Sequence, residues 1–173
     1  KVSDPFGKSS VMVRPLLVLV AVQVMLGGLM SGMKAGFAYP TFPMMNGEWL
    51  PSILFDSSQW TLNNMKEYDS GNMFAPALIQ VLHRLMAYTI FVLGIIFGYR
   101  AYKHRVNGIF RFSVRLFLSL LIVQVVLGIF TLLGCQSGKV PLTLGVMHQA
   151  VGLLTLSAIV FVWYLKTHLA QYR

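Results

Sequence analysis

The sequence has 173 residues, of which 56% are hydrophobic and only 11% are charged, and its mean hydropathy is +0.68. Soluble domains average about 45–50% apolar and about 25% charged residues. The composition excludes an ordinary soluble domain, a disordered tail and, despite a net charge of +9, a nucleic-acid-binding domain, which needs a solvated basic face. We expect an integral membrane protein, since about 20 residues suffice for each helical crossing of a lipid bilayer.

Four stretches are apolar over a length that can cross a bilayer as a helix. In chain order they are about 15–33, 75–99, 112–134 and 140–165. None shows the alternating pattern of a membrane barrel strand. The predicted fold class is therefore all-α, an integral membrane four-helix bundle.

The segments outside the spans divide the chain further. The predicted divisions are a tail of residues 1–14, a membrane domain of residues 15–165 with a long loop at 34–74, and a tail of residues 166–173. The loop holds four of the five acidic residues together with prolines and tryptophans, which favours a packed cap on the membrane surface. Because the chain begins at Lys1 rather than Met, we expect a fragment of a longer protein.

Basic residues predict the orientation, because the cytoplasmic loops of membrane proteins are enriched in Lys and Arg. Ten of the fourteen lie before the first span, around the connection between the second and third spans, or after the fourth: Lys1, Lys8, Arg14, Arg100, Lys103, Arg105, Arg111, Arg115, Lys166 and Arg173. We expect both termini on the cytoplasmic side of a bacterial plasma membrane, or on the matrix side of a mitochondrial inner membrane.

The first and third spans share a phrase that contains a rare polar residue, VQVMLG at residues 22–27 and VQVVLG at residues 123–128. The second and fourth spans share a histidine followed one helical turn later by a small residue, at His83 and His148. Because the matched positions include the uncommon polar residues, we interpret the chain as two similar helical hairpins.

His83 and His148 each lie eight residues from the outer end of their span, at a depth of about 12 Å. Ionisable side chains at such a depth are costly and indicate function. Haem iron accepts two axial imidazoles, whereas zinc or copper needs further ligands that the spans do not offer. The pair is therefore predicted to ligate haem iron, with structural hydrogen bonding as the alternative. His104 and His168 lie outside the spans and are expected to be solvated.

Three further polar side chains are candidates for contact with the cofactor. Arg84 adjoins His83 and can pair with a haem propionate or extend to the lipid headgroups. Gln23 and Gln124 can bond the cofactor, although hydrogen bonds across helices are the favoured interpretation. Cys135 is the only cysteine, which excludes an intrachain disulfide and haem attachment through a cysteine pair.

Several of these residues stand in stretches that resemble the haem A synthases. Residues 31–51, SGMKAGFAYPTFPMMNGEWLP, are similar to that family's loop after the first span of its C-terminal half. The His83-Arg84 pair resembles the same pair in one of its spans, and residues 127–150 resemble its last hairpin. The resemblance runs from Arg14 to Leu165.

The resemblance implies an eight-span enzyme of two similar four-helix halves, which oxidises the C8 methyl group of haem O to the formyl group of haem A for cytochrome oxidase. It also implies that His83 and His148 are axial ligands of a haem b cofactor in the C-terminal half, which relays electrons. The family's N-terminal half takes haem O and carries a Glu-x-x-His phrase, which this sequence lacks. We therefore expect the cofactor half, with its catalytic residues unknown and haem O bound in the missing half or in a second subunit.

Three other functions stay open at this point. One is a bis-histidine b-type cytochrome that anchors an electron-transfer complex in the membrane. Another is a half-length haem A synthase that acts as a homodimer. The third is a structural or assembly protein whose histidines bond only to neighbouring helices.

Overall fold

The computed structural model describes residues 11–66, 71–103 and 108–169. Four long helices make up most of these residues: α1 (Val13–Gly32), α3 (Phe74–Lys103), α4 (Gly108–Gly134) and α5 (Leu142–Leu169). Shorter elements connect them: η2 (Ala35–Phe37), η3 (Ser52–Phe55), η4 (Ser57–Gln59), α2 (Leu62–Lys66) and η5 (Cys135–Ser137). The predicted all-α class is confirmed for the described residues.

Each of the four long helices is long and apolar enough to cross a membrane, with a mean hydropathy between 1.8 and 2.7 over its best window. The predicted spans therefore correspond to α1, α3, α4 and α5. Three helices extend by several residues beyond a predicted end: α3 ends at Lys103 rather than at about 99, α4 begins at Gly108 rather than at about 112, and α5 ends at Leu169 rather than at about 165. An α-helix continues past an apolar stretch until a turn or proline stops it. Pro76 stands in the first turn of α3, where proline costs no intrahelical hydrogen bond.

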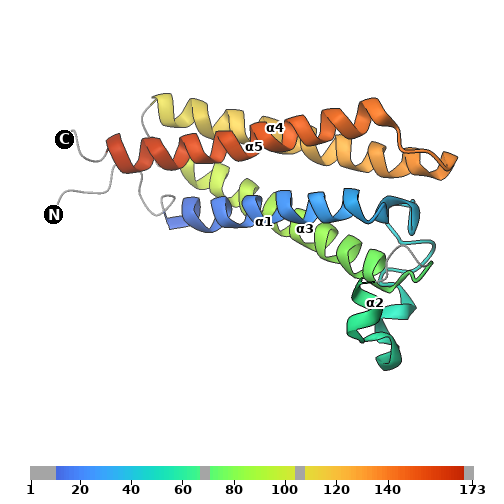
Figure 1. The fold of residues 1–173 in the computed structure, drawn as a ribbon. Coiled ribbons are helices and arrows are strands. Elements are labelled where there is room, and N and C mark those ends of the chain that lie inside the picture. The colour runs from blue at the N-terminus through green and yellow to red at the C-terminus, as the bar shows by residue number, and fades with distance from the viewer. Residues whose placement is uncertain (1–10, 67–70, 104–107, 170–173) are drawn as a thin grey trace.

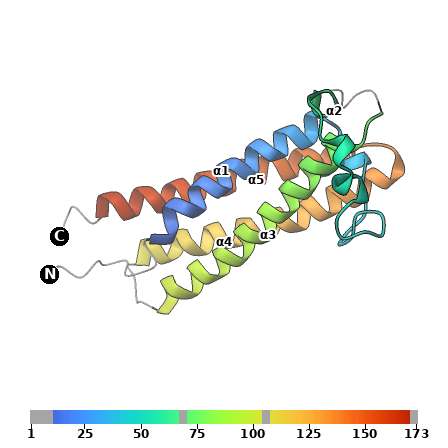
Figure 2. The same ribbon diagram turned by 90° about the horizontal axis from the view of Figure 1, so that it is seen from below.

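The helices pack as an up-and-down bundle (Figure 1). The most extensive contacts join α4 to α5 and α1 to α3, with further contacts between α1 and α5 and between α3 and α4. The start of α1 and the end of α5 lie at one end of the bundle, and α2 lies at the opposite end (Figures 1 and 2). The side of the membrane on which each end lies, and the kinship of the two hairpins, stay predictions.

The main hydrophobic cluster lies at one end of this bundle, and other buried residues such as Phe74 and Ala77 lie at the other end. The largest members of the cluster are Phe97 of α3 and Phe110 and Phe117 of α4, all fully buried, and Phe97 meets Phe110 edge to face at 6.5 Å. The first half of α1 and the second half of α5 also contribute to this cluster. Their residues are Val13, Leu16, Val20, Ala158, Ile159, Val162 and Leu165. All of these residues lie towards the end where α1 begins and α5 finishes.

The segment between α1 and α3 folds against the other end of the bundle. Asn46 donates its backbone N–H to the Thr41 hydroxyl at 2.6 Å and its side-chain amide to the Ala38 carbonyl at 3.1 Å. Further along, Trp60 meets Phe74 edge to face at 5.1 Å. Asp56 accepts hydrogen bonds from the backbone and hydroxyl of Ser58, which lower the pKa of its carboxyl group. The segment is thus ordered by its own side chains.

Parts of the predicted divisions lie outside the described residues. These parts are residues 1–10 and 170–173 of the two tails, residues 67–70 of the long loop, and residues 104–107 with His104 and Arg105.

Candidate functional site

A cavity of about 540 Å³ lies among the four long helices at the end away from the buried core. Ligand sites in proteins commonly measure about 300–1,000 Å³ and have mostly apolar walls. The floor is formed by core residues, among them Val20, Ile90 and Leu121. Phe37 and Phe42, from the segment between α1 and α3, line the cavity at its outer end. Packed side chains thus border the cavity below, and a folded segment borders it above.

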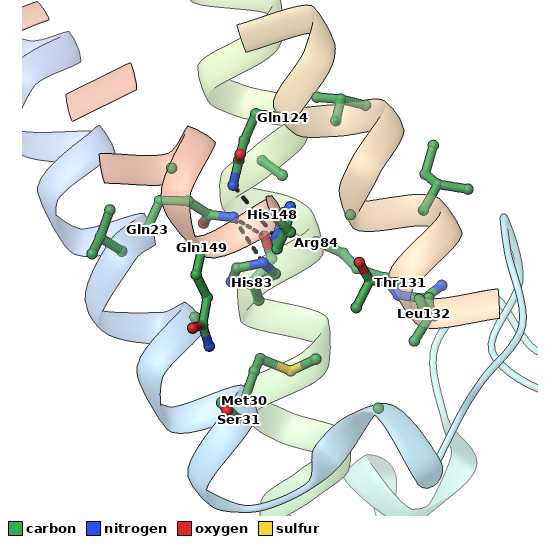
Figure 3. Close-up of a pocket in the computed structure, with 18 of the residues that line it drawn as sticks. Gln23, Met30, Ser31, His83, Arg84, Gln124, Thr131, Leu132, His148 and Gln149 are labelled. Atoms are coloured by element: carbon green, nitrogen blue, oxygen red, sulfur yellow. Dashed lines mark hydrogen bonds between the residues drawn. The ribbon is translucent and has the colours of Figure 1, made fainter. Parts of the chain in front are cut away.

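His83 of α3 and His148 of α5 both line this cavity. Figure 3 shows the two imidazoles close together in the middle of the site. Both side chains are half-buried, and the Nδ1 atom of each ring is buried with no hydrogen-bond partner among the described residues. Because buried polar atoms are normally paired, these two atoms mark a place where a ligand is expected to complete the site.

A glutamine from the preceding span contacts each histidine. The Gln23 amide nitrogen lies 3.2 Å from His83 Nε2 and donates to the His83 backbone carbonyl at 3.1 Å. The Gln124 amide nitrogen lies 3.4 Å from His148 Nε2. Both glutamines therefore bond across helices, as the sequence favoured (Figure 3). In each pair the Nε2 atom of the imidazole therefore lies within hydrogen-bond distance of a glutamine amide.

Glycines let the helices approach at this level. A Cβ atom at Gly128 of α4 would lie 2.9 Å from His148 Cε1, and a Cβ at Gly152 of α5 would lie 3.1 Å from the Gln124 amide nitrogen. At Gly27 of α1 the corresponding distance to His83 Cε1 is 3.5 Å, an ordinary contact. The α4–α5 side of the site is thus packed more tightly than the α1–α3 side.

Arg84 holds the segment that covers the site. Its guanidinium donates to the backbone carbonyls of Thr41 at 2.7 Å, Pro43 at 3.0 Å and Tyr39 at 3.2 Å, with a longer contact to that of Met44 at 3.5 Å. The group also lies 6.0 Å from the Phe42 ring centroid. Arg84 lines the cavity, but four carbonyls of the covering segment engage its terminal nitrogens.

Sequence reasoning missed Gln80, which is fully buried one helical turn before Arg84 and donates to the Tyr39 carbonyl at 2.8 Å. The sequence did contain a signal for Gln80, because an amide side chain in an apolar span, one helical turn from an arginine, indicates a polar contact. It also missed Gln136, which donates to the Pro40 carbonyl at 2.9 Å.

Burial and the Glu48 carboxylate raise the pKa of the Tyr39 phenol, so this side chain stays protonated at neutral pH.

The donor set of the cavity suits only some ligands. Over the described ranges, no three His, Cys, Asp or Glu side chains come close enough together to hold a metal ion. The two imidazoles can nevertheless fill the two axial positions of a metal that a planar ligand already holds by its other four bonds. The described His168 stacks on Tyr164, with ring centroids 4.1 Å apart, near the end of α5 and outside the cavity.

Comparison with known proteins gives one family. The profile of the COX15-CtaA family, described as cytochrome oxidase assembly protein, matches residues 5–160. The chain is similar to the heme A synthase of Nitrosospira multiformis, with 39% identity over 147 residues, and to that of Brucella anthropi, with 34% identity over 148 residues. These alignments cover 85% and 86% of this chain but 38% of each relative. No solved structure matches.

Proposed function

The chain belongs to the COX15-CtaA family of cytochrome oxidase assembly proteins, and on that basis we propose that it is the haem b-binding part of a haem A synthase. Such an enzyme converts the C8 methyl group of haem O to a formyl group, which removes four electrons and adds one oxygen atom. The chain spans 38% of the length of the curated relatives it matches. Haem O would therefore bind in another part of the protein or in a second copy.

The observation that carries the proposal is that two imidazoles from separate spans line one apolar cavity. The residues fit a haem group because the cavity walls are mostly apolar, glycines lie against both rings, and the two imidazoles come from separate helices. His83 and His148 would be the axial ligands. With both axial positions filled by imidazoles, haem b supplies one-electron transfer rather than oxygen binding.

The remaining residues of the chain would position this pair. In the structure Gln23 and Gln124 contact the rings from the first and third spans. Arg84 and Gln80 hold the covering segment over the cavity through carbonyls of residues 39–44, which limits the access of water. The repeated Gln, Gly and His positions also support two similar hairpins that share one cofactor.

The test is a haem titration of the full chain in lipid nanodiscs, followed by absorption spectra of the oxidised and reduced forms. We expect a low-spin b-type spectrum that is lost in His83→Ala and in His148→Ala. His168→Ala is the matched control, because His168 lies outside the cavity, and it should keep the spectrum. Circular dichroism checks that all variants stay helical. A folded wild-type chain that takes up no haem would contradict the proposal.

A further inference from the structure

Two cationic side chains line the cavity, and their surroundings differ. Arg84 has its terminal nitrogens engaged by carbonyls of residues 39, 41, 43 and 44. Lys34 also lines the cavity and is exposed at its outer end, where α1 has just finished. Within the described residues, its ammonium group has neither a hydrogen bond nor an ion pair in the structure. Lys34 is therefore the cation that stays available to a ligand in the cavity.

The backbone at Lys34 is a second, independent observation. Its φ of +49° places it in the left-handed region directly after the C-cap residue of α1, Met33. Helices end in this conformation mostly through glycine, because a side chain at such a φ is strained. The lysine thus occupies a position where glycine would serve the helix end better, and strain of this kind is often found at functional positions.

The polarity of the cavity gives the direction in which a ligand would lie. The floor is apolar, with Val20, Ile90 and Leu121, whereas Ser31 and Lys34 line the outer end. An apolar ligand with acidic groups at one edge would place that edge outward, because burying a carboxylate against the apolar floor costs several kcal/mol. Haem has this chemistry, with two propionates on one edge of an apolar ring.

We propose that Lys34 binds a carboxylate of the ligand that occupies the cavity and so fixes the orientation of that ligand. This inference rests on the proposed haem site and adds a residue for recognising the acidic edge. Because the lysine is exposed, water screens the pair, and the contribution to affinity is expected to be about 1.5-fold to fivefold.

The experiment compares two probes, haem b and its dimethyl ester, whose carboxyl groups carry no charge. The full chain in nanodiscs is titrated with each, and dissociation constants are read from the absorption spectra. Wild type should bind haem b about 1.5-fold to fivefold more tightly than the ester. Lys34→Gly should reduce that ratio to about one while leaving the thermal midpoint unchanged or higher, because glycine fits the left-handed backbone. Lys34→Arg should keep the preference.

Lys139→Ala is the control, because Lys139 is exposed in the turn between α4 and α5 and does not line the cavity. The Lys139→Ala variant should prefer haem b over the dimethyl ester to the same degree as wild type. Equal affinities of wild type for the two probes, or an equal loss of both in Lys34→Gly, would overturn the inference and leave the histidine site standing. A folded wild-type chain that binds neither probe would overturn the proposed function and this inference with it.

Discussion

Gly128 sets the position of the His148 ring. A Cβ atom there would lie 2.9 Å from Cε1 and within 3.5 Å of both ring nitrogens, so Gly128→Ala must displace the imidazole. Overpacking of this kind costs about 1–3 kcal/mol, and we expect haem affinity to fall about tenfold. Spectroscopic titration measures the change. Gly32→Ala is the control, since nothing lies within 4 Å of its Cβ and it does not line the cavity, and an equal loss in that variant would contradict the explanation.

Gln124 makes a bond that iron ligation through Nε2 would have to break. Its amide nitrogen lies 3.4 Å from His148 Nε2, so the free protein pays for the exchange when the ligand enters. Gln124→Leu removes a hydrogen bond from the free state alone, worth about 0.5–1.5 kcal/mol, and should tighten haem binding about threefold to tenfold. Isothermal titration or absorption titration measures this. Weaker binding in the variant would mean that the glutamine contacts the ligand directly.

At the residue scale, the sequence predicted which side chains lie in the site but not every group that these side chains contact. The pairing of His83 with His148 in one cavity followed from their rarity in apolar spans and from their equal depth. The four carbonyls that meet Arg84 could not be predicted. They belong to a segment about 40 residues away, whose path depends on turns and side-chain bonds of its own rather than on any periodic pattern.

Among the elements, α3 carries the largest share of the site. Gln80, His83 and Arg84 follow one another within two turns. One helix therefore places an imidazole in the cavity and two hydrogen-bond donors against the covering segment. Helix existence was predictable here because apolar length is a strong signal. A packed cap was expected at residues 34–74, but its individual turns could not be predicted, since short 3-10 turns leave little trace in composition.

The segment between α1 and α3 should become more mobile when the guanidinium group of Arg84 is removed. Arg84→Lys replaces a planar group with several donors by a single ammonium, which cannot reach carbonyls of Tyr39, Thr41 and Pro43 together. We expect faster hydrogen exchange at the Met45 and Asn46 amides and a loss of about 2 kcal/mol of local stability. Arg100→Lys, at the other end of the same helix, is the control. Unchanged exchange in Arg84→Lys would show that the segment is held by other contacts.

At the scale of the whole molecule, the main hydrophobic cluster and the candidate site lie at opposite ends of the bundle. The cluster lies at the end where α1 begins and α5 finishes, and the cavity lies at the other end. Substitutions at the histidines therefore leave the core intact, which is why loss of haem and loss of fold can be measured separately. Hydropathy predicted the number of helices but not this division, because an average over a whole span does not show which part of it packs against other helices.

The same separation makes the orientation testable. Basic residues predict that the core end faces the cytoplasm or matrix, so the covering segment should face the opposite side. In a Cys135→Ser background expressed in bacteria, Asn63→Cys should react with a membrane-impermeant maleimide in intact cells, and Tyr102→Cys should react only in inverted vesicles. Both positions are exposed, at opposite ends of the bundle. The reverse labelling pattern would place the basic end outside and refute the orientation. Equal labelling of both positions in sealed cells, with vesicle integrity verified, would refute a chain that crosses the bilayer between them.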